Sequence, residues 1–193
     1  MAESESTALH AACRSGDFIQ VVVLFNQGVN VDRADASGRT PLYLASSKGH
    51  TKIAEMLLYN GASVDRVNIY GLTPLSVACS HGHVGCVTAL LRYGANIDGR
   101  RLSQWTPLYF ACLRGRNEVV KALLAAGADV NGAPWRDWIP LGAASTGGYT
   151  DVVVTLLRAG ADRHRVDGHG RSPLDNATEN GHGDVAAILR DST

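Results

Sequence analysis

The sequence predicts an all-α solenoid built from six 33-residue helix-turn-helix repeats with short β-hairpin connections. The first observation is an unbroken period of 33 residues, which is marked by Thr7, Thr40, Thr73, Thr106, Ile139 and Ser172. The second is a glycine that recurs at one fixed place in every copy: Gly16, Gly49, Gly82, Gly115, Gly148 and Gly181. A segment of this length cannot bury its own apolar face, so neighbouring copies must stack and share one core.

The second repeat shows how one unit is expected to form. Thr40 can cap a helix with its hydroxyl, Pro41 has the backbone angle of a first helical residue, and Gly49 ends the helix. A second helix is predicted from about residue 51 to 60, because its apolar residues have the spacing of one helix face. These residues are Ile53, Ala54, Leu57 and Leu58. Gly61 then ends the second helix, and residues 62–65 lead into a turn.

The same pattern places the domain boundaries. We expect an N-terminal tail at 1–6, one domain at 7–190 and a C-terminal tail at 191–193. The repeats are then 7–39, 40–72, 73–105, 106–138, 139–171 and 172–190.

Several short motifs recur together at these positions. They are Thr-Pro-Leu at 40–42, Gly-His at 49–50, Leu-Leu at 57–58 and Gly-Ala at 61–62. Together they resemble the ankyrin repeat, over about Thr7 to Leu189. The resemblance implies an L-shaped stack with hairpins on one side. It also implies a concave face of hairpins and first helices, and a role in protein recognition.

The fifth repeat departs most from this pattern. Ile139 has no hydroxyl with which to cap the helix, although Pro140 remains. The same repeat contains Gly142, Gly147 and Gly148, which raise the entropy cost of ordering it. The histidine that is usual after Thr-Pro-Leu remains only as His10. We therefore expect the fifth repeat to be the loosest and to show the fastest hydrogen exchange.

Composition narrows the class of protein. Eighteen basic and eighteen acidic residues give a net charge of zero, which disfavours a dedicated nucleic-acid binder. The first ten residues contain no apolar run, and the stretch from Val21 to Phe25 is far too short to cross a bilayer. Cys13, Cys79 and Cys112 share one column with small residues, as expected for buried, reduced thiols. We expect an intracellular protein of the cytoplasm or nucleus.

Three consecutive turns carry large apolar side chains, where turn tips are normally polar. The next turns on either side carry Ala36 and Ser37 or Gly168 and His169 instead. Exposed aromatic and arginine residues are common anchors of protein interfaces. The predicted partner-binding residues are Ile69, Tyr70, Leu72, Arg100, Leu102, Trp105, Tyr109, Arg114, Trp135, Arg136 and Trp138.

The arginines among these residues suggest a basic rim, which fits an acidic peptide with apolar anchors. The alternative is that Leu72, Trp105 and Trp138 fold back on their own helices while the arginines are merely solvated. Gln104 and Asp137 also replace a tip glycine, which indicates a different turn shape.

Chemical sites have weaker support. Cys79, His81, His83 and Cys86 have the types and density of zinc ligands, but the cysteines fall in core columns and His83 matches His50 and His182. Asp167, His169 and His164 lack a nucleophile in a defined arrangement, and no phosphate-binding loop is present. Asn131 resembles the ankyrin context of asparagine hydroxylases, although a polar turn residue explains it equally. We expect no metal, no cofactor and no enzymatic activity.

The leading hypothesis is therefore a monomeric binding module for a partner protein or extended peptide. A structural or assembly role is the alternative, through self-association or docking to a flanking domain. The apolar segment from Val21 to Phe25 supports it, because a first repeat ought to present a polar outer face. Nucleic-acid binding through the arginines ranks last.

Overall fold

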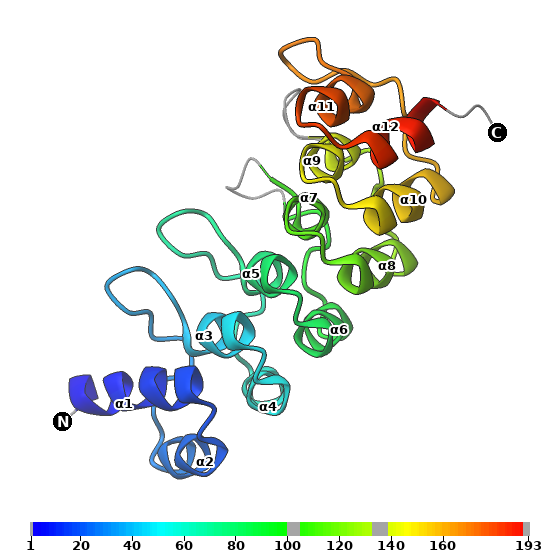
Figure 1. Ribbon diagram of the computed structural model, residues 1–193. Helices are drawn as coiled ribbons and strands as arrows, with labels where there is room; N and C mark the ends of the chain where they lie inside the picture. Colours follow the sequence, from blue (N-terminus) through cyan, green and yellow to red (C-terminus); the bar gives the residue numbers. More distant parts are fainter. Residues whose placement is uncertain (1, 100–104, 133–138, 191–193) are drawn as a thin grey trace. The chain divides into compact units, whose positions relative to one another are not determined.

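The computed structural model describes residues 2–99, 105–132 and 139–190, with side chains from residue 8 onward. These residues form twelve α-helices and no β-strand, which confirms the predicted fold class (Figure 1). The chain divides into two compact units, of which the first contains α1–α6 and the second α7–α12.

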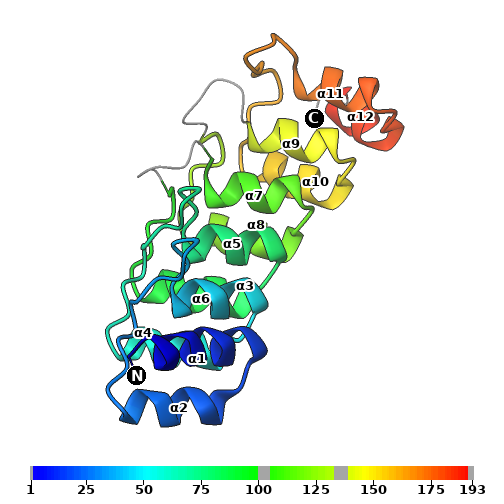
Figure 2. The ribbon, with the colours of Figure 1, turned by 90° about the vertical axis from the view of Figure 1, so that its left-hand side faces the viewer.

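The first unit is built from three helix pairs. The first helices of the pairs are α1 (Ala2–Ser15), α3 (Pro41–Lys48) and α5 (Pro74–His81). The second helices are α2 (Phe18–Asn26), α4 (Thr51–Tyr59) and α6 (Val84–Arg92). α3 packs between α1 and α5, and α4 contacts α2 and α6, so the helices form two rows. The connections that precede α3 and α5 lie on the same side of the first row (Figures 1 and 2).

The second unit repeats this arrangement. Its first row contains α7 (Pro107–Leu113), α9 (Pro140–Thr146) and α11 (Pro173–Glu179). Its second row contains α8 (Asn117–Ala125), α10 (Thr150–Arg158) and α12 (Gly183–Arg190). α9 packs between α7 and α11, and α10 contacts both α8 and α12.

The start of each first helix follows the capping residues of the sequence. The hydroxyls of Thr40, Thr73 and Thr106 each accept a hydrogen bond of 3.1 Å from the backbone N–H three residues later. Ser172 caps α11 in the same way and forms a capping box with Asp175. At α9 the capping residue is Ile139, which makes no side-chain cap, as predicted.

The glycines that end the first helices also provide room for the next repeat. Gly49 ends α3 with φ of 75°, a left-handed conformation that favours glycine. A Cβ atom there would lie 2.6 Å from the ring of His83. That ring fills the space, and its Nε2 donates to the carbonyl of Ser47 at 3.2 Å. The glycine therefore ends one helix and admits a bond from the following pair.

The core lies between the two helix rows of each unit. The predicted apolar face of α4 is buried, and so are the leucines after each Thr-Pro, at 42, 75 and 108. Cys13, Cys79, Cys86 and Cys112 are all buried, and none of them forms a disulfide. Burial raises the pKa of the Cys13 thiol to about 12, so this cysteine stays protonated and unreactive.

The connections between helix pairs form turns rather than regular strands. In the first, the N–H of Asp35 donates to the carbonyl of Arg39 at 2.9 Å, and Gly38 donates to Asp35. The described residues contain no β-ladder, so the predicted β-hairpins are not confirmed. α1 begins at Ala2 and takes in most of the expected N-terminal tail; the domain boundaries stay predictions.

None of the helices in the described residues is both long and apolar enough to cross a bilayer.

Candidate functional site

The turn at residues 68–72, named here the Ile69 turn, is held rigidly. The Oδ1 atom of Asn68 accepts hydrogen bonds from the N–H groups of Tyr70 (2.9 Å) and Leu72 (3.0 Å). Its Nδ2 donates to the hydroxyl of Tyr43 on α3 at 3.3 Å. One buried amide therefore fixes the shape of the turn and joins it to the first-helix row.

The Ile69 turn presents two large apolar side chains to solvent. Ile69 is 63% exposed and Tyr70 is 72% exposed, whereas Leu72 is half-buried. The turns at Asp35 and Asp167 have the same backbone bonds but carry small or polar tips. The apolar tip is therefore a property of these side chains and not of the turn geometry.

Neighbouring turns and helices in the first unit form one surface. The N–H of Ile69 donates to the carbonyl of Ser37 in the preceding turn at 3.1 Å. His10 on α1 donates from Nε2 to the carbonyl of Arg39 at 3.1 Å. The hydroxyl of Tyr43, in the same column as His10, receives the bond from Asn68. Tyr43 therefore joins its helix to a turn although this column no longer holds the histidine.

The second unit holds the other predicted site residues that can be placed. Trp105 is half-buried, and its ring packs edge-on against Phe110 of α7, at 5.8 Å between ring centroids. It therefore packs on α7, the helix that it precedes. Tyr109 is buried on α7, where burial raises the pKa of its hydroxyl to about 12.

Arg114 is exposed, but it follows the last residue of α7. α7 has seven residues and is about 10 Å long, so Arg114 lies about that far from the turn before the helix. Arg100, Leu102, Trp135, Arg136 and Trp138 lie outside the described residues.

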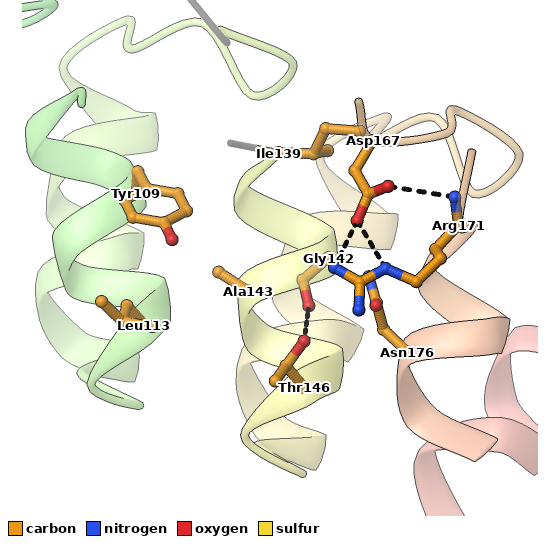
Figure 3. Close-up of a pocket in the computed structure, with 9 residues that line it drawn as sticks. All are labelled: Tyr109, Leu113, Ile139, Gly142, Ala143, Thr146, Asp167, Arg171 and Asn176. Carbon is orange, nitrogen blue, oxygen red and sulfur yellow. Dashed lines mark hydrogen bonds and ion pairs between the residues drawn. The ribbon is translucent and has the colours of Figure 1, made fainter. Parts of the chain in front are cut away.

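A cavity of about 240 Å³ opens between the first helices of the second unit (Figure 3), and we name it the Gly142 pocket. Its lining comes from α7, α9, α11 and the turn before α11. The lining residues are Tyr109, Leu113, Ile139, Gly142, Ala143, Thr146, Asp167, Arg171 and Asn176. Gly142 stands in a column that elsewhere holds His10, Tyr43, Ser76, Tyr109 and Asp175, so a missing side chain helps to open the space.

The charged groups at the pocket neutralise each other. Burial tends to raise the pKa of Asp167, but its carboxylate accepts bonds from the N–H groups of Arg171 and His169 and pairs with the Arg171 guanidinium. Together these contacts hold the pKa of Asp167 below its ordinary value. Arg171 also lies 3.8 Å from Glu179, so its guanidinium is shared between two carboxylates.

Of the nine lining residues, the sequence predicted only Tyr109 as a site residue, and Gly142 and Asn176 are the most informative of those that it missed. Gly142 was interpreted only as a source of looseness in α9. Asn176 was passed over, although it is the one polar residue in a column that otherwise reads Ala11, Leu44, Val77, Phe110 and Ala143. Comparing columns across the repeats would have revealed it.

A further signal concerns the two unusual turns. The described turns that precede α3, α5 and α11 are anchored by Asp35, Asn68 and Asp167, whose side chains cap the backbone. The equivalent residues of the other two turns are Arg101 and Pro134, which cannot accept such bonds. The sequences of those two turns therefore have neither an anchor residue of this type nor the tip glycine.

The residues considered for metal binding have structural contacts. Cys79 and Cys86 are buried in the core, His81 bonds the carbonyl of Val77 through Nδ1 at 2.9 Å, and His83 bonds Ser47. Within the ranges that the structure describes, no group of three or more His, Cys, Asp or Glu side chains could hold a metal ion. Asn131 accepts a bond from the N–H of Asp162 at 2.9 Å, a structural role in joining adjacent repeats.

Comparison with known proteins adds two findings. The family model for ankyrin repeats, in three copies, matches residues 1–68 and again residues 63–134. A segment of 53 residues, 28% of this chain, is 36% identical to acyl-CoA-binding domain-containing protein 1 of Arabidopsis thaliana. That segment covers 16% of the Arabidopsis protein, so the similarity extends over a small part of both chains.

Proposed function

Because the chain belongs to the ankyrin-repeat family, whose members are generally non-catalytic protein-interaction modules, we propose that it binds a partner protein or extended peptide. The binding surface is the side formed by the turns and the first helices. The partner supplies apolar groups that cover the tips of the turns.

The observation that carries this proposal is the exposure of Ile69 and Tyr70 on a turn with fixed geometry. Large apolar side chains on a rigid turn lose little conformational entropy when a partner covers them. Asn68 fixes the turn by three hydrogen bonds, so the backbone that carries the two side chains is already ordered. A partner therefore gains contact area at low cost in ordering.

Other predicted residues belong to the proposal within each unit. Leu72 supports the turn surface of the first unit and Trp105 and Tyr109 that of the second, since each is at least half-buried. Leu102, Trp135 and Trp138 would continue the apolar tips, and Arg100, Arg114 and Arg136 would favour acidic residues of the partner. Acyl-CoA binding by the Arabidopsis relative is not carried over, because the match covers only 16% of that protein.

A double variant tests the proposal. Ile69→Ser with Tyr70→Ser removes both apolar tips and leaves the Asn68 bonds to backbone intact. Tyr59→Ser is the matched control, because Tyr59 is 80% exposed on the second-helix row of the same unit. Tagged proteins are incubated with extract of the cells that express the chain, and captured proteins are quantified by mass spectrometry.

We expect at least one protein to be captured by the wild type and the control and to fall about tenfold or more with the double variant. That loss corresponds to one or two apolar anchors at an interface. Equal capture of every protein by the double variant would refute binding through the turns.

An assembly role remains the second candidate, and one observation favours it. α2 exposes Phe18, Ile19 and Val23 to solvent, and Ile19 is 76% exposed. Equivalent second helices carry Lys52, Glu118 or Asp151 at the position of Ile19.

A further inference from the structure

The side chain of Asn176 is buried and makes no hydrogen bond to the described residues. It is 5% exposed on α11, and in the described part of the chain no hydrogen bond to its side-chain amide is formed. The amide of Asn68, by contrast, bonds through both its oxygen and its nitrogen. The Asn176 amide atoms are not among the described side-chain atoms that are shut off from solvent without a partner, so the amide can exchange water for a ligand group.

Gly142 leaves space beside this amide. A Cβ atom on Gly142 would lie 3.3 Å from Nδ2 of Asn176, so the amide faces the helix at the point where a side chain is missing (Figure 3). Gly142 is inside α9 and does not have a positive φ, so the backbone does not require glycine. Glycine disfavours a helix interior relative to alanine. Gly142 instead leaves space for the pocket beside the Asn176 amide.

The size of the pocket indicates what can enter it. Its volume of about 240 Å³ equals roughly eight water molecules at their liquid volume. Sites for cofactors and drug-sized ligands usually exceed about 300 Å³. One side chain of a bound peptide is therefore a better match than a small-molecule ligand.

The charges at the pocket favour an uncharged side chain. The Arg171 guanidinium is 3.0 Å from Asp167 and 3.8 Å from Glu179, so it is already paired. The Asp167 carboxylate is equally committed, because it accepts two backbone bonds besides the arginine. Neither a carboxylate nor an ammonium group on the partner would find an unpaired charge at this pair.

We propose that the Gly142 pocket binds the side chain of a glutamine on the partner peptide. Its amide donates to Oδ1 of Asn176 and accepts from Nδ2, since each amide offers both donor and acceptor. Its aliphatic stem lies against Leu113, Ile139 and Ala143. This inference rests on the proposed function and adds the identity of one partner residue.

A random 12-residue peptide library displayed on phage provides the probe. The library is selected on the full chain, and the selected peptides are then tested for binding to the wild type and to Gly142→Leu. Gly142→Leu fills the pocket, whereas Asn176→Leu removes the amide and restores the apolar residue found at Leu44, which is buried in the same column. Thermal unfolding by circular dichroism verifies that both variants fold, and Tyr59→Ser is the control.

Affinities of the selected peptides are then measured by fluorescence anisotropy. We expect a shared glutamine whose replacement by methionine or glutamate weakens binding to the wild type about tenfold, as expected for lost hydrogen bonds to a buried amide. The methionine replacement should cost much less against Asn176→Leu, because the amide partner is then absent. This coupling separates direct recognition from a merely structural role of Asn176.

Each other result has a definite meaning. Peptides that bind the wild type and Gly142→Leu equally would overturn the pocket and leave the proposed function intact. Pocket-dependent peptides without a required glutamine would overturn the assignment of the amide. Failure to select any peptide would count against both the pocket and the proposed function.

Discussion

At the scale of single residues, three side chains do the same structural work with different chemistry. Asp35, Asn68 and Asp167 each accept two backbone N–H groups across a turn, at 2.9 or 3.0 Å. The two carboxylates also pair with Arg39 and Arg171, while the neutral amide does not need a cation. The stability of two of the three turns therefore depends on pH, and that of the third does not.

The pH dependence of stability should show this difference. Burial tends to raise the pKa of Asp167, but the hydrogen bonds and the arginine lower it by more, so the folded pKa lies below the unfolded value. A lowered pKa contributes stability that is fully present above the unfolded pKa, near 3.9, and is lost as pH falls through the folded pKa. Asp167→Asn keeps the backbone bonds and removes the charge.

We expect this variant to lose less than about 1 kcal/mol at pH 7, because the arginine is half-exposed and such pairs are weak. Its stability should then fall less than that of the wild type between pH 5 and about pH 3. Urea unfolding at these pH values measures both quantities, and Asp35→Asn repeats the test in the first unit. An identical fall in variant and wild type would show that the carboxylate adds no pH-dependent stability.

At the scale of helices, the sequence predicted the repeating elements closely. α3 begins at Pro41 and is followed by Gly49, and α4 begins at Thr51, each as the capping residues and apolar spacing indicate. These signals are local, so one repeat contains all the information required. The β-hairpins were predicted from the short stretches that follow the second helices, whereas the described turns close by backbone bonds and by side-chain bonds and contain no strand.

The candidate site could be predicted only in part. The exposed tip at Ile69 and Tyr70 follows from residue type and turn position alone. The Gly142 pocket could not be predicted in this way. Its lining residues Tyr109, Gly142 and Asn176 belong to three repeats, and each contributes one side of the cavity. The partial burial of Trp105 also could not be predicted from the residue alone, because its ring packs edge-on against Phe110.

The α9 helix should be the least stable first helix of the second unit. Its capping position is Ile139, which makes no side-chain bond, whereas Thr106 and Ser172 cap α7 and α11. Gly142 lies within it, and Gly147 and Gly148 follow its last residue. A missing cap costs about 1 kcal/mol, and an interior glycine costs about 0.5–1 kcal/mol.

Hydrogen exchange followed by mass spectrometry should therefore find α9 faster than α7 and α11. Gly142→Ala should slow hydrogen exchange in α9 and raise the free energy of unfolding by up to about 1 kcal/mol. The Asn176 amide must then move slightly away from the new methyl group. Slower exchange in α9 than in both neighbours would contradict this account of its capping and glycine content.

At the scale of the whole molecule, stability is distributed along the chain. Each first helix packs on the first helices of adjacent pairs in its unit, and the buried leucines recur in every repeat. Stability in such arrays is approximately a sum of repeat and nearest-neighbour terms. A weak α9 can therefore persist, because α7 and α11 hold it on both sides, and its surface can serve binding.

The apolar face of α2 raises the question of self-association, which decides between the two candidate functions. α2 has nine residues and is about 14 Å long, so its exposed face has an area on the order of 150 Å². A stable dimer usually buries about 800 Å² on each partner. Phe18, Ile19 and Val23 alone therefore provide too little area, although they could contribute to a larger contact.

We accordingly expect a single species of monomer mass in sedimentation equilibrium from about 1 to 100 μM, a range in which weak dimers with micromolar affinity would be detected. Ile19→Lys, which introduces the residue found at the equivalent Lys52, should leave that mass unchanged. A mass that rises with concentration in the wild type and not in Ile19→Lys would instead establish assembly through α2. The turns and first helices would then remain free in the assembled form, since α2 belongs to the second-helix row.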